Sequence, residues 1–185
     1  RLEIRSEVGR GTTVTISLPP AEPPEWFVAK LELDPGGIIV VVDDDVSIHH
    51  VWQGRFDSLR VKEQGIEVLL FSGPAELRGW ARDNPSPAAL FLLDYEFLGQ
   101  AETGLNLAED LGLAGKSILV TSRFEEKSVL AECRRLKIRL IPKGMAGFVP
   151  VSIRGQQEQA AAGKPAKAGP DAVLLADASS RIALL

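Results

Sequence analysis

The sequence predicts an α/β fold built on an open parallel sheet of five strands, with helices on both faces. Three observations support this prediction. Short apolar stretches alternate with amphipathic stretches five times between residues 37 and 150. The first apolar stretch, Ile38–Val42, contains no polar residue, as expected for a strand buried on both faces. Apolar residues make up 45% of the chain, which is enough for a buried core.

The predicted elements follow one another in a regular order. Strands are expected at 38–42, 67–71, 88–93, 117–120 and 138–141, and helices at 46–59, 74–82, 104–111 and 125–136. Pro74 opens the second helix, where its missing N–H costs nothing. Arg134 and Arg135 end the fourth helix, where cations suit the helix dipole. A helix after the fifth strand is barely visible, because Pro150 would interrupt it.

Residues 1–19 have the pattern of a short β-hairpin. A turn at Gly9-Arg10-Gly11 precedes an alternating Thr and Val stretch. Two strands cannot bury a core alone, so we expect this segment to be the tail of another domain or an addition to the next one. Residues 20–36 begin with several prolines and are interpreted as a linker.

The carboxyl-terminal part differs in composition from the predicted domain at 37–150. Residues 151–170 are rich in Gln, Ala, Gly, Lys and Pro without periodicity, which indicates a disordered linker. Residues 171–185 become apolar again. This segment is either the first strand of a further domain or a tail.

Composition excludes several classes of function. The formal net charge of −4 gives no support to nucleic-acid binding, which needs a concentrated basic face. The single cysteine, Cys133, excludes an intramolecular disulfide and a cysteine-rich zinc site. No apolar run reaches the roughly 18 residues that span a bilayer. The chain starts at Arg1 without a signal-peptide pattern, so we expect a cytoplasmic segment of a longer protein, with no membrane contact of its own.

Charged and hydroxyl side chains follow four of the five predicted strands. They are Asp43-Asp44-Asp45, Asp94, Thr121 and Lys143. The carboxyl ends of parallel strands meet at one edge of a sheet, so these groups should converge. Clustered carboxylates repel one another unless a cation is bound, and open oxygen sites suit Mg²⁺. With a lysine and a threonine alongside to bind a phosphoryl group, the pattern predicts phosphoryl transfer onto a carboxylate, with Asp94 as the nucleophile.

Residues 37–143 resemble the receiver domain of two-component signalling. The resemblance rests on the ordered set Val-Val-Val-Asp43-Asp44-Asp45, Leu92-Leu93-Asp94, Leu119-Val120-Thr121-Ser122 and Lys143. It implies a flavodoxin-like sheet with strand order 2-1-3-4-5.

The resemblance also implies roles for individual residues. Mg²⁺ would be held by Asp43, Asp44, Asp94 and the backbone carbonyl of Glu96. Asp94 would be the phosphoacceptor, Thr121 the switch hydroxyl and Lys143 the partner of the phosphoryl group. The chain departs from the family in its longer loop after Asp94, in Pro142 before Lys143 instead of after it, and in Leu140 where an aromatic residue is common.

Residues 6–19 are similar to the closing strands of a histidine-kinase ATPase domain. This similarity implies that the parent protein is a hybrid sensor histidine kinase, whose ATP-binding and phosphohistidine segments lie outside this chain. The phosphodonor would be a histidine kinase or a histidine phosphotransfer domain. Whether the chain is itself an enzyme, and whether it forms a homodimer, is left open by the sequence.

Two other functions compete with this interpretation. A receiver-like module without phosphorylation would serve only protein contacts. A haloacid-dehalogenase-like phosphohydrolase would use Asp43 as nucleophile and Asp45 as acid–base. That second function needs a further acidic pair after Lys143, which the sequence lacks, and it leaves Asp94 without a role.

Overall fold

The computed structural model describes residues 1–19, 21–84 and 89–155. The chain divides into two units, Arg1–Arg154 and Gly155–Leu185. The predicted disordered linker at 151–170 is wrong at its start, because Val151–Ile153 form a strand of the fold. The rest of that linker, from residue 156, and the apolar segment 171–185 lie outside the described residues. No helix in the described part of the chain is long and apolar enough to cross a membrane.

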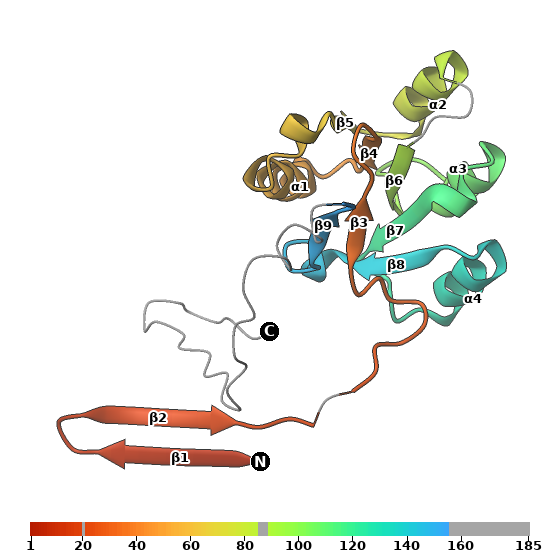
Figure 1. The fold of residues 1–185 in the computed structure, drawn as a ribbon. Helices are drawn as coiled ribbons and strands as arrows, with labels where there is room; N and C mark the ends of the chain where they lie inside the picture. Colours follow the sequence, from red (N-terminus) through yellow and green to blue (C-terminus); the bar gives the residue numbers. More distant parts are fainter. Residues whose placement is uncertain (20, 85–88, 156–185) are drawn as a thin grey trace. The chain divides into compact units, whose positions relative to one another are not determined.

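A parallel sheet of five strands forms the centre of the first unit (Figure 1). Its strands are β4 (Ile38–Val42), β5 (Glu67–Phe71), β6 (Ala89–Asp94), β7 (Ser117–Thr121) and β8 (Arg139–Pro142). They lie in the order β5-β4-β6-β7-β8, which is 2-1-3-4-5 when these five are numbered along the chain. The predicted flavodoxin-like fold is therefore confirmed.

Three helices cover one face of the sheet. They are α2 (Pro74–Asp83), α3 (Gly104–Asp110) and α4 (Lys127–Leu136). Leu77, Leu105 and Val129 from these helices pack against strand residues such as Phe91 and Leu119. Successive strand residues point to opposite faces, so the alternate strand residues, such as Val41 and Leu92, belong to the core on the other side.

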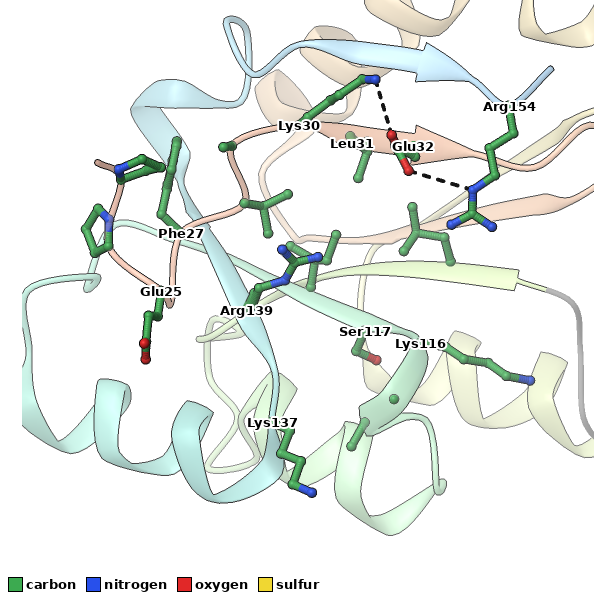
Figure 2. A pocket seen from close by; sticks show the side chains of 18 residues that line it. Glu25, Phe27, Lys30, Leu31, Glu32, Lys116, Ser117, Lys137, Arg139 and Arg154 are labelled. Atoms are coloured by element: carbon green, nitrogen blue, oxygen red, sulfur yellow. Dashed lines mark ion pairs between the residues drawn. The ribbon is translucent and has the colours of Figure 1, made fainter. Parts of the chain in front are cut away.

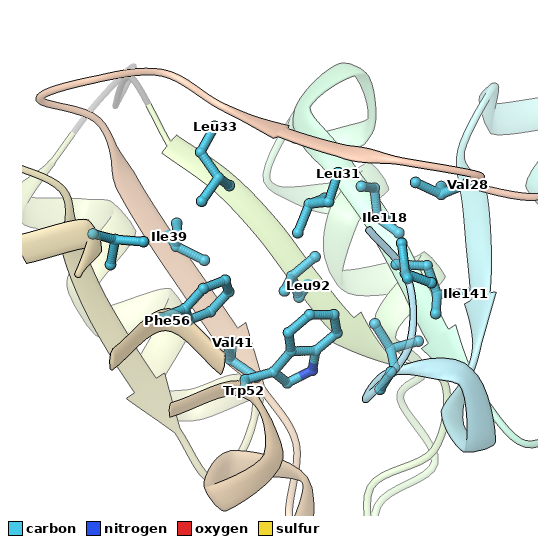
Figure 3. Close-up of a cluster of buried hydrophobic side chains, with 14 of the residues drawn as sticks. Val28, Leu31, Leu33, Ile39, Val41, Trp52, Phe56, Leu92, Ile118 and Ile141 are labelled. Atoms are coloured by element: carbon cyan, nitrogen blue, oxygen red, sulfur yellow. The ribbon is translucent and has the colours of Figure 1, made fainter. Parts of the chain in front are cut away.

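The other face is covered by one helix and by a small second sheet. The helix is α1 (Val46–Ser58), and the sheet pairs β3 (Leu31–Leu33) in parallel with β9 (Val151–Ile153). Trp52 and Phe56 of α1 stack with ring centroids 5.6 Å apart. Figure 3 shows these two rings facing the strands, with Leu31 and Leu33 on the same side of the sheet.

Residues 26–33, which we call the strap, belong to the fold, although the sequence predicts a linker over 20–36. The Leu140 amide donates to the Trp26 carbonyl at 2.8 Å, and the Val28 amide donates to the Leu140 carbonyl at 3.0 Å. The strap thus pairs with the free edge of β8 before it becomes β3. Val28 and Leu31 are each 1% exposed. With the short η3 (Lys143–Met145) and β9, the strap occupies the face where a fifth helix is barely visible in the sequence.

The remaining elements are two 3₁₀ turns and an amino-terminal hairpin. Single 3₁₀ turns form η1 (Val61–Gln64) and η2 (Ala114–Lys116). Residues 1–17 form the expected hairpin, in which β1 (Leu2–Glu7) pairs antiparallel with β2 (Gly11–Ile16). Leu2 faces Ile16 and Ile4 faces Val14 across this hairpin. These four side chains are between 55% and 67% exposed.

Candidate functional site

The residues predicted to carry the chemistry lie at the carboxyl ends of four neighbouring strands. Asp43 follows β4, Asp94 ends β6, Thr121 ends β7 and Lys143 follows β8. Asp43, Asp94 and Thr121 are buried, with exposures of 1%, 6% and 1%. The sheet topology has brought together groups that are far apart in the sequence.

Lys143 joins two of the carboxylates. Its Nζ atom lies 2.5 Å from Asp94 Oδ2 and 3.0 Å from Asp43 Oδ2. Its side chain is 17% exposed, so this contact is largely shielded from water. One ammonium group therefore faces two carboxylates, and the cluster keeps an excess of negative charge.

A third carboxylate completes a candidate metal site. Asp43, Asp44 and Asp94 each offer an oxygen, and these oxygens lie within 4.8 Å of one another. Asp44 Oδ2 also accepts a hydrogen bond from the Leu98 amide at 2.7 Å, which ties it to the loop after Asp94. Asp43 Oδ2 is buried, faces the ammonium of Lys143 and accepts no hydrogen bond from a described residue. The site therefore offers three carboxylate oxygens as ligands, and one of them, the buried Asp43 Oδ2, accepts no hydrogen bond from a described residue. Such a set of oxygen ligands fits Mg²⁺.

The environment shifts the pKa values of all three contacting groups. Burial raises the pKa of Asp94 to about 6, and the neighbouring charge of Asp43 adds to this rise, while Lys143 opposes it. Burial likewise raises the pKa of Asp43. Burial alone would lower the pKa of Lys143, but its hydrogen bonds to Asp94 and Asp43 outweigh that effect and raise it. Burial thus destabilises the charged forms of Asp43 and Asp94, and a bound cation would stabilise them.

Gly104 fixes the backbone around Asp94, a role that the sequence did not reveal. The Tyr95 amide donates to Asp94 Oδ1 at 2.6 Å, and the Gly104 amide donates to the Tyr95 carbonyl at 3.0 Å. A Cβ atom on Gly104 would lie 1.9 Å from the Asp94 carbonyl oxygen, which no side chain can tolerate. Gly104 therefore positions Asp94. The sequence feature that could have indicated this role is the position of Gly104 directly after Thr103, a threonine that can cap a helix. In the structure Thr103 does cap α3, and it forms a capping box with Asn106.

Thr121 and Glu96 are arranged around Arg123. The hydroxyl oxygen of Thr121 accepts a hydrogen bond from the Arg123 amide at 3.0 Å. The Arg123 side chain pairs with Glu96 and Glu126, and its guanidinium lies 5.3 Å from the centroid of the Tyr95 ring. The roles of the Thr121 hydroxyl as a switch and of the Glu96 carbonyl as a metal ligand stay predictions.

Asp45 has a different place from its two neighbours. Its Oδ1 atom accepts from the Ser47 amide at 2.8 Å and so caps the start of α1. Its hydrogen bond to Ser47 keeps its pKa below the usual value. A residue held in this way as an anion suits capping better than proton transfer.

The sequence matches no family model and no curated protein. Solved structures of receiver domains and response regulators are similar to it in fold. Chemotaxis protein CheY4 of Vibrio cholerae is 14% identical, with 64% of this chain and 87% of that chain covered and a TM-score of 0.42. The response regulator TrrA of Thermotoga maritima, in complex with Mg²⁺–BeF, is 19% identical, with 68% and 96% covered and a TM-score of 0.43. The amino-terminal domain of a receiver protein from Methanoculleus marisnigri is 15% identical, with 68% and 89% covered and a TM-score of 0.43.

Proposed function

We propose that this chain is a receiver module that accepts a phosphoryl group onto Asp94. The observation that carries the proposal is the convergence of Asp94, Asp43 and Lys143 at one edge of the sheet, with the ammonium of Lys143 2.5 Å from Asp94 Oδ2. A structural ion pair would need one carboxylate. A second buried carboxylate, Asp43, shares the same ammonium, and the exposed Asp44 adds a third negative charge beside them, so the cluster holds more carboxylates than one ion pair requires.

The proposed step is a displacement at phosphorus. A carboxylate oxygen of Asp94 attacks the phosphorus of a phosphohistidine, so that an O–P bond forms as the N–P bond breaks. The imidazole nitrogen leaves with the electron pair of that bond and takes up a proton. Lys143, already in contact with Asp94, would pair with a phosphoryl oxygen.

Magnesium belongs to this proposal as the resident cation. Asp43, Asp44 and Asp94, together with the backbone carbonyl of Glu96, would hold it. When bound, Mg²⁺ would offset the charge that develops on the phosphoryl oxygens. The residues of the chain orient the carboxylates through the Leu98 amide on Asp44 and the Tyr95 amide on Asp94.

The wider context of the module is also proposed. The hairpin at 1–17 exposes Leu2, Ile4, Val14 and Ile16 on one face, a pattern that suits a sheet completed by further strands. This supports its interpretation as the closing strands of a histidine-kinase ATPase domain, and so the placement of the module in a cytoplasmic hybrid histidine kinase. A histidine kinase or a histidine phosphotransfer domain would then be the donor.

A second candidate is a receiver-like module that acts only through protein contacts. The observation in its favour is that Lys143 already bridges Asp43 and Asp94, which satisfies much of the cluster without any ligand.

Labelling by radioactive acetyl phosphate tests the proposal. The full chain is compared with Asp94→Asn, with Asp43→Asn and with Asp83→Asn as a matched control on the exposed side of α2, each with and without Mg²⁺. Label that requires Mg²⁺, is lost in Asp94→Asn and is retained in Asp83→Asn is the expected result. Label that survives Asp94→Asn and is lost in Asp43→Asn would favour a phosphohydrolase. A folded protein that takes no label and binds no Mg²⁺ would favour the contact-only module.

A further inference from the structure

A large hollow lies at the amino-terminal ends of the strands, opposite the carboxyl-terminal ends where Asp94 lies. It has a volume of about 770 Å³ and opens between residues 23–32 and the amino-terminal ends of β6, β7 and β8 (Figure 2). Its apolar lining includes Phe27, Leu31, Leu90 and Ile118. The hollow is a direct consequence of the strap, because its walls are the strap on one side and the strands on the other.

The lining of this hollow is strongly cationic. Five basic residues contribute to it, namely Lys30, Lys116, Lys137, Arg139 and Arg154, against the two acidic residues Glu25 and Glu32. The chain as a whole carries a net charge of −4, so this concentration of positive charge does not reflect composition. Cations gathered in a concave surface raise the local potential and attract anions.

Ion pairs account for only part of this charge. Glu32 lies 3.2 Å from Lys30 and 3.8 Å from Arg154, and Arg154 also pairs with Asp34 at 2.8 Å. Lys137 and Arg139, in contrast, form no ion pair with any residue in 1–19, 21–84 or 89–155. Figure 2 shows the Arg139 side chain extending from β8 toward the strap. Two of the cations that line the hollow, Lys137 and Arg139, thus have no acidic partner among the described residues.

Lys137 is held in place by the backbone. It ends α4 with a left-handed φ of 57° and is followed at once by Ile138 and Arg139, which lead into β8. Because α4 and β8 are both packed in the core, the backbone of Lys137 and Arg139 is fixed before any ligand arrives. Little ordering of the main chain would then be needed on binding.

We propose that this hollow binds a phosphorylated small molecule of nucleotide size, with Lys137 and Arg139 as the residues that recognise its phosphates. A hollow of this volume lies within the range of about 300–1,000 Å³ that is usual for small-molecule sites. Arginine presents a planar set of donors that matches phosphate oxygens, and lysine adds a point charge. The apolar part of the lining that is partly exposed, Phe27 and Leu90, suits a base or another apolar group on the same ligand. The proposal is independent of phosphorylation at Asp94.

Calorimetric titration of the full chain with ATP and with inorganic pyrophosphate tests this proposal. The buffer contains EDTA, so that no divalent cation can bridge a phosphate to the acidic cluster around Asp94. The double variant Lys137→Gln/Arg139→Gln is compared with Lys127→Gln/Arg134→Gln, which removes the same charge from α4 outside the hollow. Circular dichroism of each variant verifies that it is folded.

We expect ATP to bind the unmodified chain at least ten times more tightly than pyrophosphate. We also expect Lys137→Gln/Arg139→Gln to weaken ATP binding at least tenfold, with less than a twofold change in the control pair. Three outcomes would overturn the proposal: no binding of either probe below 1 mM, equal affinity for both probes, or equal weakening in the two double variants.

Discussion

The two ends of the parallel strands in the central sheet carry opposite charge. We call their carboxyl-terminal ends the carboxyl edge of the sheet and their amino-terminal ends the amino edge. At the carboxyl edge three carboxylates lie close together and two of them, Asp43 and Asp94, contact one ammonium group. The pKa of Asp94 is raised to about 6 mainly by burial and further by the charge of Asp43. At the amino edge, five cations line a hollow together with two carboxylates. One edge therefore carries an excess of negative charge and the other an excess of positive charge. The sheet thus separates a candidate cation and phosphoryl site from a candidate anion site by the length of its strands.

The edges also differ in how rigidly their charges are held. At the carboxyl edge each carboxylate is oriented by a backbone amide, such as Tyr95 for Asp94 and Leu98 for Asp44. At the amino edge, Arg139 and Lys137 are fixed through their backbone and are exposed. Substitution should therefore affect stability strongly at the first edge and weakly at the second.

The largest loss of stability is expected for Gly104→Ala. The new Cβ atom would meet the Asp94 carbonyl oxygen at 1.9 Å, so α3 or β6 would have to move. We expect a loss of about 4 kcal/mol or more in the free energy of unfolding, measured with urea. Gly79→Ala is the control, because Gly79 lies in α2 and a methyl group added there would have no neighbouring atom within 4 Å. That variant should gain up to about 1 kcal/mol, and similar losses in both would contradict the close contact.

Leu31→Ala tests whether the strap belongs to the fold. Leu31 is 1% exposed against the sheet, so its truncation should cost about 3 kcal/mol in the free energy of unfolding. Leu18→Ala, at a residue that is 80% exposed outside the strap, should change stability by less than about 0.5 kcal/mol. If Leu31→Ala were as harmless as Leu18→Ala, the segment would be a linker after all.

Lys143→Met compares the two edges directly. It leaves Asp43 and Asp94 without their shared cation, and we expect a loss of about 2–3 kcal/mol at pH 7, measured by urea unfolding without Mg²⁺. Arg139→Gln removes one of several like charges at the amino edge and should change stability by less than about 0.5 kcal/mol. Equal losses of stability in Lys143→Met and Arg139→Gln would show that charged side chains contribute equally to stability at the two edges.

The smallest of these effects is the pH dependence due to Asp94. Its pKa of about 6 in the folded protein lies above the ordinary value of 3.8, so the folded state binds the proton more tightly than the unfolded state. The resulting stabilisation is present below pH 4 and is lost as the pH rises through 6. Without Mg²⁺, Asp94→Asn should therefore be more stable than the unmodified chain at pH 7.5, by on the order of 2 kcal/mol, and the difference should shrink at pH 4.5. Thermal unfolding at the two pH values measures this, and an advantage of equal size at both would rule out titration of Asp94 as its cause.

Much of the fold and of the acidic site could be predicted because their signals are local. The run Ile38–Val42 reads as a buried strand, and Asp43 follows it directly. Parallel topology then requires Asp94 and Lys143, at the ends of other strands, to lie at the same edge. The prediction for these residues needed no knowledge of side-chain packing.

The strap shows where local signals fail. Val28, Leu31 and Leu33 are buried. They lie in a short segment that follows several prolines, and this pattern predicts a linker. Their partners are Leu140 of β8 and the three residues of β9, from the other end of the domain. Each of β3 and β9 is only three residues long, so the alternation of apolar and polar residues in them is too short to predict a strand.

The sequence by itself determined the five-stranded parallel sheet and the residues at its carboxyl edge, because each follows from a buried run and the polar residue that ends it. The order of the strands was predicted from the resemblance to receiver domains, not from these local runs. Only the tertiary structure decided that residues 26–33 cover the second face, that Gly104 touches the Asp94 backbone, and that cations from separate elements line one hollow. These features depend on where distant segments meet in space, and no local pattern of residues encodes that meeting.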